Sequence, residues 1–278
     1  MTARVALITG ASSGIGEATA QRLAALGFTV YAAARRVERM ASFADSGVRV
    51  LPLDVTDEAS MTACVRTIIE ETGRIDVLVN NAGYGSFGAL EDVPLDEARK
   101  QFDVNIFGLA RMTQLVLPTM RAQASGTIVN ISSVGGTIAE PLGSWYHATK
   151  FAVEGLSDAL RLELEPFGIH VVIIEPGAIR TEWNTIARDG LMKTSGRSAY
   201  AAQAERVRRV FAAADNPGQG SEPSVVADAI ARAVQARRPK TRYAVGANAK
   251  AGTLASRLLP DRVLDAVMRR IFRPDARR

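Results

Sequence analysis

Tyr146 and Lys150 are the two residues whose types and spacing most directly suggest chemistry. They lie four positions apart, which on an α-helix places the phenol and the ammonium on one face. A free phenol has a pKa of about 10, and a neighbouring cation favours the phenolate and lowers that pKa towards neutrality. The pair therefore predicts a proton donor and acceptor, although the same spacing also occurs on ordinary solvated helix faces.

A glycine-rich turn near the amino terminus suggests a ligand for this proton donor. The apolar residues 4–8 predict a buried strand that runs into residues 9–16 (TGASSGIG) and then into a helical pattern. Such a strand, turn and helix bind phosphate, because glycines allow close backbone approach and the first N–H groups of the helix face the anion. The spacing departs from the G-x-G-x-x-G dinucleotide fingerprint, so the turn alone is weak evidence.

Further motifs along the chain occur in the order and at the spacing that are typical of the short-chain dehydrogenase/reductase family. The chain resembles this family over roughly residues 4–246. The resemblance implies a catalytic tetrad of Asn105, Ser133, Tyr146 and Lys150. Ser132 is the alternative candidate for the catalytic serine. Ser133 is preferred because its offset from Tyr146 matches the family pattern. The residues expected to contact the cofactor are Gly10, Ser12, Ser13, Gly14, Ile15, Gly16, Arg35, Arg36, Asp54, Val55, Asn81, Ala82, Gly83, Tyr146, Lys150, Pro176, Gly177 and Thr181.

Several of these residues also have structural interpretations. Asp54 suits a turn or helix cap, Asn81 suits the turn at the end of its strand, and Asn105 suits a helix-interior amide bonded to nearby backbone. By resemblance, Asn105 instead positions a water that continues the proton path to solvent. These alternatives remain open at the level of the sequence.

The order of the elements predicts how these motifs come together. Short β-branched runs alternate with helical patterns, which indicates right-handed βαβ units and a parallel sheet covered on both faces. Strands are expected near 4–9, 28–34, 48–53, 75–80, 126–132, 169–175 and 241–246. The predicted fold is α/β, a single-domain, Rossmann-type, doubly wound parallel sheet of about seven strands with a C-terminal helical extension. Ligands bind beyond the carboxyl ends of such strands, where the motifs fall.

Residues after the second predicted strand indicate the cofactor. An NAD site needs an acidic residue about 20 positions past the glycines, to hold the ribose 2′-hydroxyl. The chain has Ala34 there, followed by Arg35 and Arg36. Guanidinium groups bind phosphate with charge assistance, so NADP(H) is the expected cofactor, with Arg35 as the first contact. Arg36 equally suits a solvated helix start.

The family resemblance implies reversible hydride transfer between the nicotinamide and a carbonyl or alcohol carbon. Tyr146 acts as general acid or base, Ser133 hydrogen-bonds the substrate oxygen, and Lys150 tunes the phenol and holds the ribose. The basic C-terminal end resembles the hydroxysteroid and retinol dehydrogenase-like branch, which favours a lipophilic ketone or aldehyde and its alcohol. The rival hypothesis is a non-catalytic NADPH-binding sensor or scaffold, because one fold hosts many functions.

A segment at residues 178–221 is expected to form the substrate lid. Its apolar residues suit a mobile cover over an apolar ligand, although they also suit a surface helix pair. They are Trp183, Ile186, Leu191, Met192, Tyr200 and Phe211. The expected substrate contacts are Gly143 and Trp183, together with Ser133 and Tyr146.

Composition excludes several other classes of protein. The chain has 278 residues, one cysteine and two histidines, so it has no internal disulfide and no evident metal site. No signal peptide and no apolar run of about 18 residues are present, and a cytoplasmic protein is expected. His147 is predicted to point away from the Tyr146 face, and His170 to pack or cap a strand.

The basic charge is concentrated in the C-terminal region. Residues 237–278 hold twelve Arg or Lys against three Asp, a net charge of +9 within a chain of net charge +5. Residues 247–278 form a predicted extension beyond a catalytic domain at 1–246, with an apolar helical face after Pro260. This helix is expected to dock on the domain, lie on an anionic membrane or meet another subunit. No aromatic-basic motif suggests nucleic acid.

A homo-oligomer is a further expectation from the family resemblance. The predicted helix 146–167 carries a face of small residues that suits close approach of a second copy. This face consists of Ala148, Ala152, Gly155 and Ala159.

Overall fold

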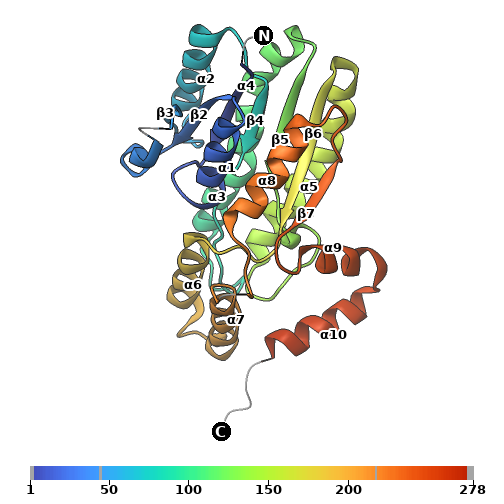
Figure 1. The fold of residues 1–278 in the computed structure, drawn as a ribbon. Helices are drawn as coiled ribbons and strands as arrows, with labels where there is room; N and C mark the ends of the chain where they lie inside the picture. Colours follow the sequence, from blue (N-terminus) through green and yellow to red (C-terminus); the bar gives the residue numbers. More distant parts are fainter. Residues whose placement is uncertain (1–2, 44–45, 217, 274–278) are drawn as a thin grey trace.

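A computed structural model of the chain describes residues 3–43, 46–216 and 218–273. Its centre is a seven-stranded parallel sheet in the order β3-β2-β1-β4-β5-β6-β7 (Figure 1). The strands are β1 (Val5–Thr9), β2 (Thr29–Ala34), β3 (Arg49–Pro52), β4 (Val77–Asn80), β5 (Gly126–Ile131), β6 (Ile169–Pro176) and β7 (Arg242–Val245). The expected Rossmann-type fold is confirmed, and each strand lies within a residue or two of its expected position.

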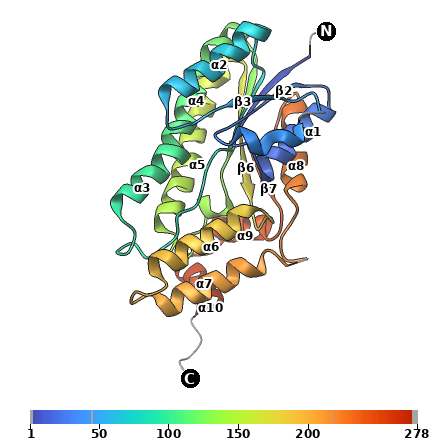
Figure 2. The ribbon, with the colours of Figure 1, turned by 90° about the vertical axis from the view of Figure 1, so that its left-hand side faces the viewer.

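Helices cover both faces of the sheet, which explains why its central strands are apolar on both sides (Figure 2). One face packs against α1 (Gly14–Ala25) and α8 (Pro223–Gln235). The opposite face packs against α2 (Glu58–Thr72), α4 (Leu109–Ala122) and α5 (Ser144–Leu164). The two buried clusters on either side of β1, β4 and β5 form the main core.

The strand order reverses between β1 and β4, which are hydrogen-bonded neighbours. In doubly wound sheets this switch point opens a crevice beyond the carboxyl ends of the strands. The segments that follow β1, β4, β5 and β6 leave the sheet at this edge. The fold therefore brings together the glycine turn, Asn81, Ser133 and Gly177, as the sequence predicts.

Four helices lie beyond the carboxyl edge of the sheet (Figure 1). The expected lid contains a pair, α6 (Glu182–Ser195) and α7 (Ala201–Ala213), that pack on each other. The C-terminal extension forms α9 (Ala249–Leu258) and α10 (Asp261–Phe272). Its final residues 274–278 lie outside the described part of the chain.

A shorter helical region connects β4 to α4 on the side of α5. It comprises α3 (Leu95–Phe102) and a π-helical turn at Asp103–Gly108. π-Helical turns are rare and often occur at functional sites. This one holds Asn105.

Across the described residues, every helix is too short or too polar to cross a bilayer. The same part of the chain contains no group of three His, Cys, Asp or Glu residues that could hold a metal ion. Cys64 is buried, and burial raises the pKa of its thiol to about 12. This thiol is therefore a core residue rather than a nucleophile.

Candidate active site

The glycine turn is built so that backbone, and not side chains, lines it. Gly10 and Gly14 have φ of +65° and +59°, which is the left-handed region that favours glycine. A Cβ on Gly16 would lie 2.4 Å from the Gly10 carbonyl oxygen, so no larger residue fits the turn as it stands. Helix α1 then begins at Gly14, and its N-cap Ser13 makes no side-chain capping bond. The first N–H groups of α1 are thus available to an anion such as pyrophosphate.

Asn81 fixes this turn against β4. Its Nδ2 donates to the carbonyl oxygens of Thr9 and Gly10, at 3.0 Å each. The Thr9 hydroxyl oxygen accepts in turn from the N–H groups of Asn81 and Ala82, again at 3.0 Å. The structure therefore gives the Asn81 side chain the turn-stabilising role that the sequence left open.

The start of the lid touches the same turn. A Cβ on Gly14 would lie 3.0 Å from the Cγ2 atom of Thr181, which is the N-cap of α6. Gly177 is equally crowded, because a Cβ there would lie 2.0 Å from the Ala247 carbonyl oxygen. Thr181 therefore lies beside the start of α1, whereas Gly177 lies against the segment that follows β7.

Arg35 and Arg36 follow β2 and are exposed. Within the described ranges, neither guanidinium has an ion-pair partner, unlike Arg39, which pairs with Glu182 of α6 at 2.5 Å. The carboxylate of Asp54 accepts hydrogen bonds from the backbone and hydroxyl of Thr56, at 2.9 and 2.7 Å. Asp54 thus shapes its own turn, while the two arginines keep their donors free for a phosphate.

Ser133 and Tyr146 meet at the carboxyl end of β5. The Tyr146 hydroxyl is hydrogen-bonded to Ser133, and the Ser133 oxygen accepts the Gly135 N–H at 3.0 Å. Tyr146 is almost fully buried, at 8% exposure. The two hydroxyls together form a site for one oxygen atom, and Ser132 takes no part in it.

Lys150 lies one turn after Tyr146, with its Nζ 5.9 Å from the centre of the phenol ring. The Nζ donates to the Ile131 carbonyl oxygen at 2.9 Å. Burial lowers the pKa of Lys150 to about 8, against an opposing effect of Glu154.

The pKa of Tyr146 differs from the sequence expectation. Burial raises it to about 12, the hydrogen bond from Ser133 opposes this, and the carboxylate of Glu140 adds to it. The expected lowering by the lysine is absent, because loss of hydration outweighs every nearby favourable charge and Lys150 is engaged by backbone. The protein alone therefore keeps Tyr146 protonated at neutral pH.

Asn105 is buried within the π-helical turn. Its Nδ2 donates to the Tyr84 carbonyl oxygen at 2.9 Å and to the Thr149 hydroxyl at 3.1 Å, and its Oδ1 accepts the Tyr84 N–H at 3.1 Å. The side chain is therefore committed to holding the segment after Gly83 beside α5. This matches the backbone-bonding alternative, and any water contact would fall to the backbone of Asn105.

His147 ties down the loop between β5 and α5. Its Nδ1 lies 2.8 Å from the Gly135 carbonyl oxygen, and its Nε2 accepts the Glu140 N–H at 3.0 Å. These contacts need the neutral ring, and burial lowers the pKa of His147 accordingly. Both ring nitrogens are thus engaged by the loop, and the ring itself packs edge-on against the Tyr146 ring, 5.6 Å apart from centre to centre.

An aromatic cluster covers Tyr146. The rings of Phe87 and Trp183 lie 5.2 and 5.3 Å from the phenol ring, centre to centre. Phe211 of α7 packs on both at 4.9 and 6.4 Å. Further apolar members are Ala89, Leu142, Ala187, Leu191, Met192, Tyr200, Ala204, Val207, Val210, Met268 and Phe272. All but one of the expected lid residues therefore belong to the cluster that covers Tyr146. The exception is Ile186, whose side chain is 54% exposed.

Phe87, Leu142 and Phe272 are members of this cluster that the sequence analysis did not assign to the site. Phe87 lies in an irregular segment after β4, Leu142 precedes α5, and Phe272 ends α10. Gly143 is buried, and a Cβ there would lie 2.8 Å from Phe87, so it supports the cluster through backbone. Only Phe272 had a signal in the sequence, namely the apolar face of its helix.

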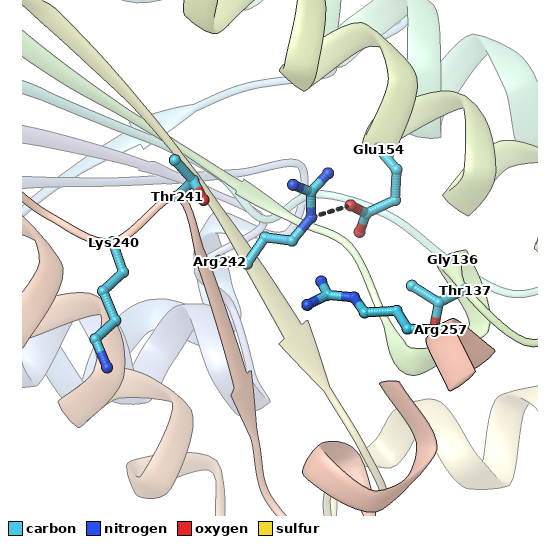
Figure 3. A pocket seen from close by; sticks show the side chains of 7 residues that line it. All are labelled: Gly136, Thr137, Glu154, Lys240, Thr241, Arg242 and Arg257. Carbon is cyan, nitrogen blue, oxygen red and sulfur yellow. Dashed lines mark hydrogen bonds and ion pairs between the residues drawn. The ribbon is translucent and has the colours of Figure 1, made fainter. Parts of the chain in front are cut away.

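A cavity of about 660 Å³ lies on another side of α5 (Figure 3). It is lined by Gly136, Thr137, Glu154, Lys240, Thr241, Arg242 and Arg257. Arg242 donates to Glu154 at 3.0 Å and to Asp158 at 2.7 Å, which fastens β7 to α5. Neither Ser133 nor Tyr146 lines this cavity, and of its charged side chains Glu154 and Arg242 pair with each other.

Comparisons with known proteins agree with this geometry. Residues 4–192 match the family model described as short chain dehydrogenase. The chain is 40% identical to a 3-ketodihydrosphingosine reductase of Bacteroides thetaiotaomicron, over 88% of this chain and 89% of that protein. It is 34% identical to an NADPH-dependent 3-dehydrocapnine reductase of Ornithobacterium rhinotracheale, over 95% of each.

A solved short-chain dehydrogenase from Streptomyces avermitilis superposes with a TM-score of 0.81, at 35% identity, over 98% of this chain and 95% of that one. A Burkholderia phymatum relative in complex with NAD, at 26% identity, covers 99% and 98% with a TM-score of 0.79. The rat estradiol 17-beta-dehydrogenase 1 is 36% identical over 87% of this chain and 74% of its own length. One such relative does not single out the hydroxysteroid or retinol branch.

The chain belongs to the short-chain dehydrogenase/reductase family. It is accordingly an oxidoreductase that acts on a carbonyl or alcohol with NAD(P).

Proposed function

We propose that the protein is an NADP(H)-dependent reductase of lipophilic ketones or aldehydes. The observation that carries this proposal is the hydrogen-bonded Ser133–Tyr146 pair enclosed by the aromatic cluster. The bound dinucleotide supplies the hydride. A dinucleotide-binding sensor needs no such pair, which disfavours the scaffold alternative.

The choice of NADP(H) over NAD(H) rests on the residues after β2. A carboxylate at Ala34 would bind the 2′-hydroxyl and repel a 2′-phosphate, but the position is apolar and buried. The free guanidiniums of Arg35 and Arg36 suit the phosphate. The relative from Ornithobacterium rhinotracheale is NADPH-dependent by name.

Tyr146 delivers the proton in the proposed reduction. Its raised pKa keeps the phenol protonated near neutral pH, which suits donation to an oxygen that gains negative charge. The Ser133 hydroxyl binds the same oxygen and fixes its distance from the phenol. In this proposal Lys150 binds the nicotinamide ribose hydroxyls and, once charged there, favours the phenolate that remains.

The lipophilic character of the substrate follows from the covering residues. Aromatic and aliphatic side chains of α6, α7 and α10 surround Tyr146, and such surfaces bind apolar ligands. Trp183 and Phe87 pack directly on the phenol ring, so α6 must shift to admit a bulky ketone. The relatives from Bacteroides and Ornithobacterium are named as reductases of 3-ketodihydrosphingosine and of 3-dehydrocapnine.

The C-terminal extension lies where such substrates would enter. Phe272 is buried in the aromatic cluster, and the guanidinium of Arg206 on α7 donates to the Ile271 carbonyl oxygen at 2.9 and 2.7 Å. Large apolar side chains along the extension are nevertheless exposed, namely Leu254, Leu258, Val263, Val267 and Ile271. With the neighbouring arginines, they suit contact with an anionic membrane surface.

Co-sedimentation with anionic vesicles tests this lipid contact. The full chain should pellet with the vesicles, and a chain ending at residue 259 should stay largely in solution. Equal pelleting of the two would remove the lipid proposal.

We also keep self-association through α5 as a proposal. Ala148, Gly155 and Ala159 are exposed, and a Cβ on Gly155 would meet nothing within 4 Å. Phe151 and Leu162 on the same helix are 48% and 67% exposed. Light scattering should show that the wild type is a dimer or higher oligomer and that Gly155→Glu dissociates it. A monomeric wild type would contradict the proposed self-association.

Steady consumption of NADPH with a panel of hydrophobic ketones and aldehydes tests the main proposal. Multiple turnovers with at least one long-chain ketone are expected, and slower turnover with NADH. Binding of NADPH without turnover on the whole panel would favour the sensor alternative.

A further inference from the structure

Three consecutive residues at the start of α6 contact three different parts of the site. Thr181 lies against the glycine turn. Glu182 forms an ion pair with Arg39, on the segment that follows β2, and the ring of Trp183 lies 5.3 Å from that of Tyr146. The first turn of α6 therefore connects the phosphate-binding turn, the arginines after β2 and the cover of the reacting hydroxyl.

The position of Arg39 is fixed by the short 3₁₀ segment η1 (Val37–Phe43). The Arg39 N–H donates to the Arg36 carbonyl oxygen at 3.2 Å, so Arg39 lies one turn beyond the residues expected to bind the 2′-phosphate. Met40 and Phe43 anchor the same segment, because both side chains are buried in the core cluster beneath α1. The segment therefore presents a further cation where a 2′-phosphate is expected.

The ion pair between Arg39 and Glu182 lies at the surface, where a ligand can replace it. The Arg39 side chain is 35% exposed and that of Glu182 is 51% exposed, with 2.5 Å between Nη2 and Oε1. Such exposed pairs contribute little to stability. A phosphate group carries more negative charge than a carboxylate and accepts two parallel hydrogen bonds from one guanidinium. The phosphate is thus the stronger partner for Arg39.

Among the described residues, no other ion pair joins α6 to the segment after β2. Arg188 of α6 pairs instead with Asp215, which follows α7, and the Asn184 amide donates to the same carboxylate at 2.7 Å. These contacts hold α6 to the end of α7, whereas Glu182 holds its first turn to the cofactor region. Loss of the pair with Arg39 would free that turn and leave the contact between the two lid helices in place.

Trp183 is packed tightly over the tyrosine. Its ring lies 5.3 Å from the Tyr146 ring and 5.7 Å from the Phe87 ring, centre to centre. A Cβ on Gly85 would lie 2.4 Å from its Cζ2 atom. Because these neighbours confine the indole, uncovering the tyrosine requires a shift of the turn that carries it.

We propose that the 2′-phosphate of NADP(H) displaces the Glu182 carboxylate from Arg39 and so releases the first turn of α6. This inference rests on the proposed function, in which α6 must shift to admit a bulky ketone. The carboxylate and the phosphate repel each other, which favours the outward position of the turn. Trp183 then uncovers Tyr146 for the ketone. Glu182 thereby makes the choice of cofactor affect the KM of the ketone as well as that of the cofactor.

The test compares the KM of one long-chain ketone under saturating NADPH and under saturating NADH. In the wild type, the KM with NADH should be about two- to fivefold higher, which is the range that an exposed ion pair supports. Glu182→Gln should lower the KM with NADH to the value with NADPH, with kcat retained. Asp228→Asn, which removes the ion pair with Arg22 of α1, is the matched control and should keep the wild-type ratio.

A second measurement follows the turn without catalysis. The chain has two tryptophans, so in Trp145→Phe the indole emission comes from Trp183 alone. Adenosine 2′,5′-bisphosphate should shift this emission to longer wavelength as the ring leaves the cluster, whereas adenosine 5′-monophosphate should not. In the same background, Glu182→Gln should show part of the shift before any nucleotide is added.

The outcomes separate the two proposals. Equal ketone KM values with the two cofactors in the wild type would overturn the exchange at Arg39 and leave the reductase intact. A KM ratio that is the same in the wild type and in Glu182→Gln would also overturn it, and so would equal emission with the two nucleotides. Failure to oxidise either NADPH or NADH with the ketone would overturn the proposed function itself.

Discussion

The phosphate-binding turn and the aromatic cluster lie at the same edge of one sheet, yet they are built in opposite ways. The turn is a contiguous stretch with little space around its backbone, as at Gly16, and its carbonyl oxygens accept hydrogen bonds from the Asn81 side chain. The cluster takes its side chains from segments between Phe87 and Phe272, which are far apart in the sequence. The first region tolerates almost no substitution, whereas the second can change its lining without disturbing the sheet.

Tyr146 lies between the two regions, and its removal should have the largest effect. Tyr146→Phe takes away the proton donor, so kcat should fall by about 10²- to 10⁴-fold while NADPH still binds. Stopped-flow and steady-state kinetics measure the two properties separately. Tyr243→Phe on β7 is the matched control, and an undiminished rate in Tyr146→Phe would show that the site has been misassigned.

A single methyl group in the turn tests how rigid that region is. The Cβ of Gly16→Ala would lie 2.4 Å from one backbone oxygen and 2.5 Å from the Asn81 amide nitrogen. Relief of this crowding costs about 1–3 kcal/mol and moves the phosphate donors, so NADPH should bind at least about 10-fold more weakly. Fluorescence titration measures this.

Gly155→Ala on α5 is the control for that experiment, because its Cβ meets nothing within 4 Å. It should bind NADPH like the wild type. If Gly16→Ala bound NADPH as tightly as the wild type, the turn would have adapted to the added methyl group. The contrast between a rigid turn and an adaptable aromatic cluster would then not hold.

Arg35 tests the part of the cofactor region that depends on a charged side chain. Arg35→Ala should reduce the preference for NADPH over NADH by about 10- to 100-fold, mainly through KM, since a charge-assisted bond to the 2′-phosphate is lost. Arg22→Ala on α1, whose partner is Asp228, is the control. An unchanged preference would transfer the role to Arg36 or to another cation.

The smallest effect is expected at the far end of the cluster. Phe272→Ala removes a buried ring at the end of α10 from the edge of the aromatic cluster. The KM for a long-chain ketone should therefore rise several-fold, which corresponds to about 1 kcal/mol, while kcat is retained. Ile271→Ala, at an exposed neighbouring position, should leave KM for the same ketone near the wild-type value. Equal KM values for all three proteins would place the substrate away from α10.

The contrast also explains what the sequence could and could not predict. The glycine turn, Asn81 and the tyrosine-lysine pair were found because each is a local pattern whose chemistry depends on residues close together in the chain. The strands were found because burial on both faces leaves an apolar run. Phe87 and Leu142 were missed because their position depends on packing between distant segments, which no local pattern records.

The pKa of Tyr146 was the second property that the sequence could not predict. Spacing alone indicated a lowered pKa for Tyr146, but the burial of the hydroxyl and the nearby Glu140 raise it instead. Neither the depth of Tyr146 nor the position of an acid six residues earlier can be judged from a helical repeat. The hydrogen bonds of the Asn105 side chain could not be predicted from the sequence either, because they join the π-helical turn to the segment after β4.

The contact between Gly14 and Thr181 has a kinetic consequence. Because Thr181, the N-cap of α6, lies against Gly14 of the glycine turn, a dinucleotide bound at that turn would lie beside the start of the lid. We therefore expect ordered addition, with the coenzyme first on and last off, and product-inhibition patterns would test it.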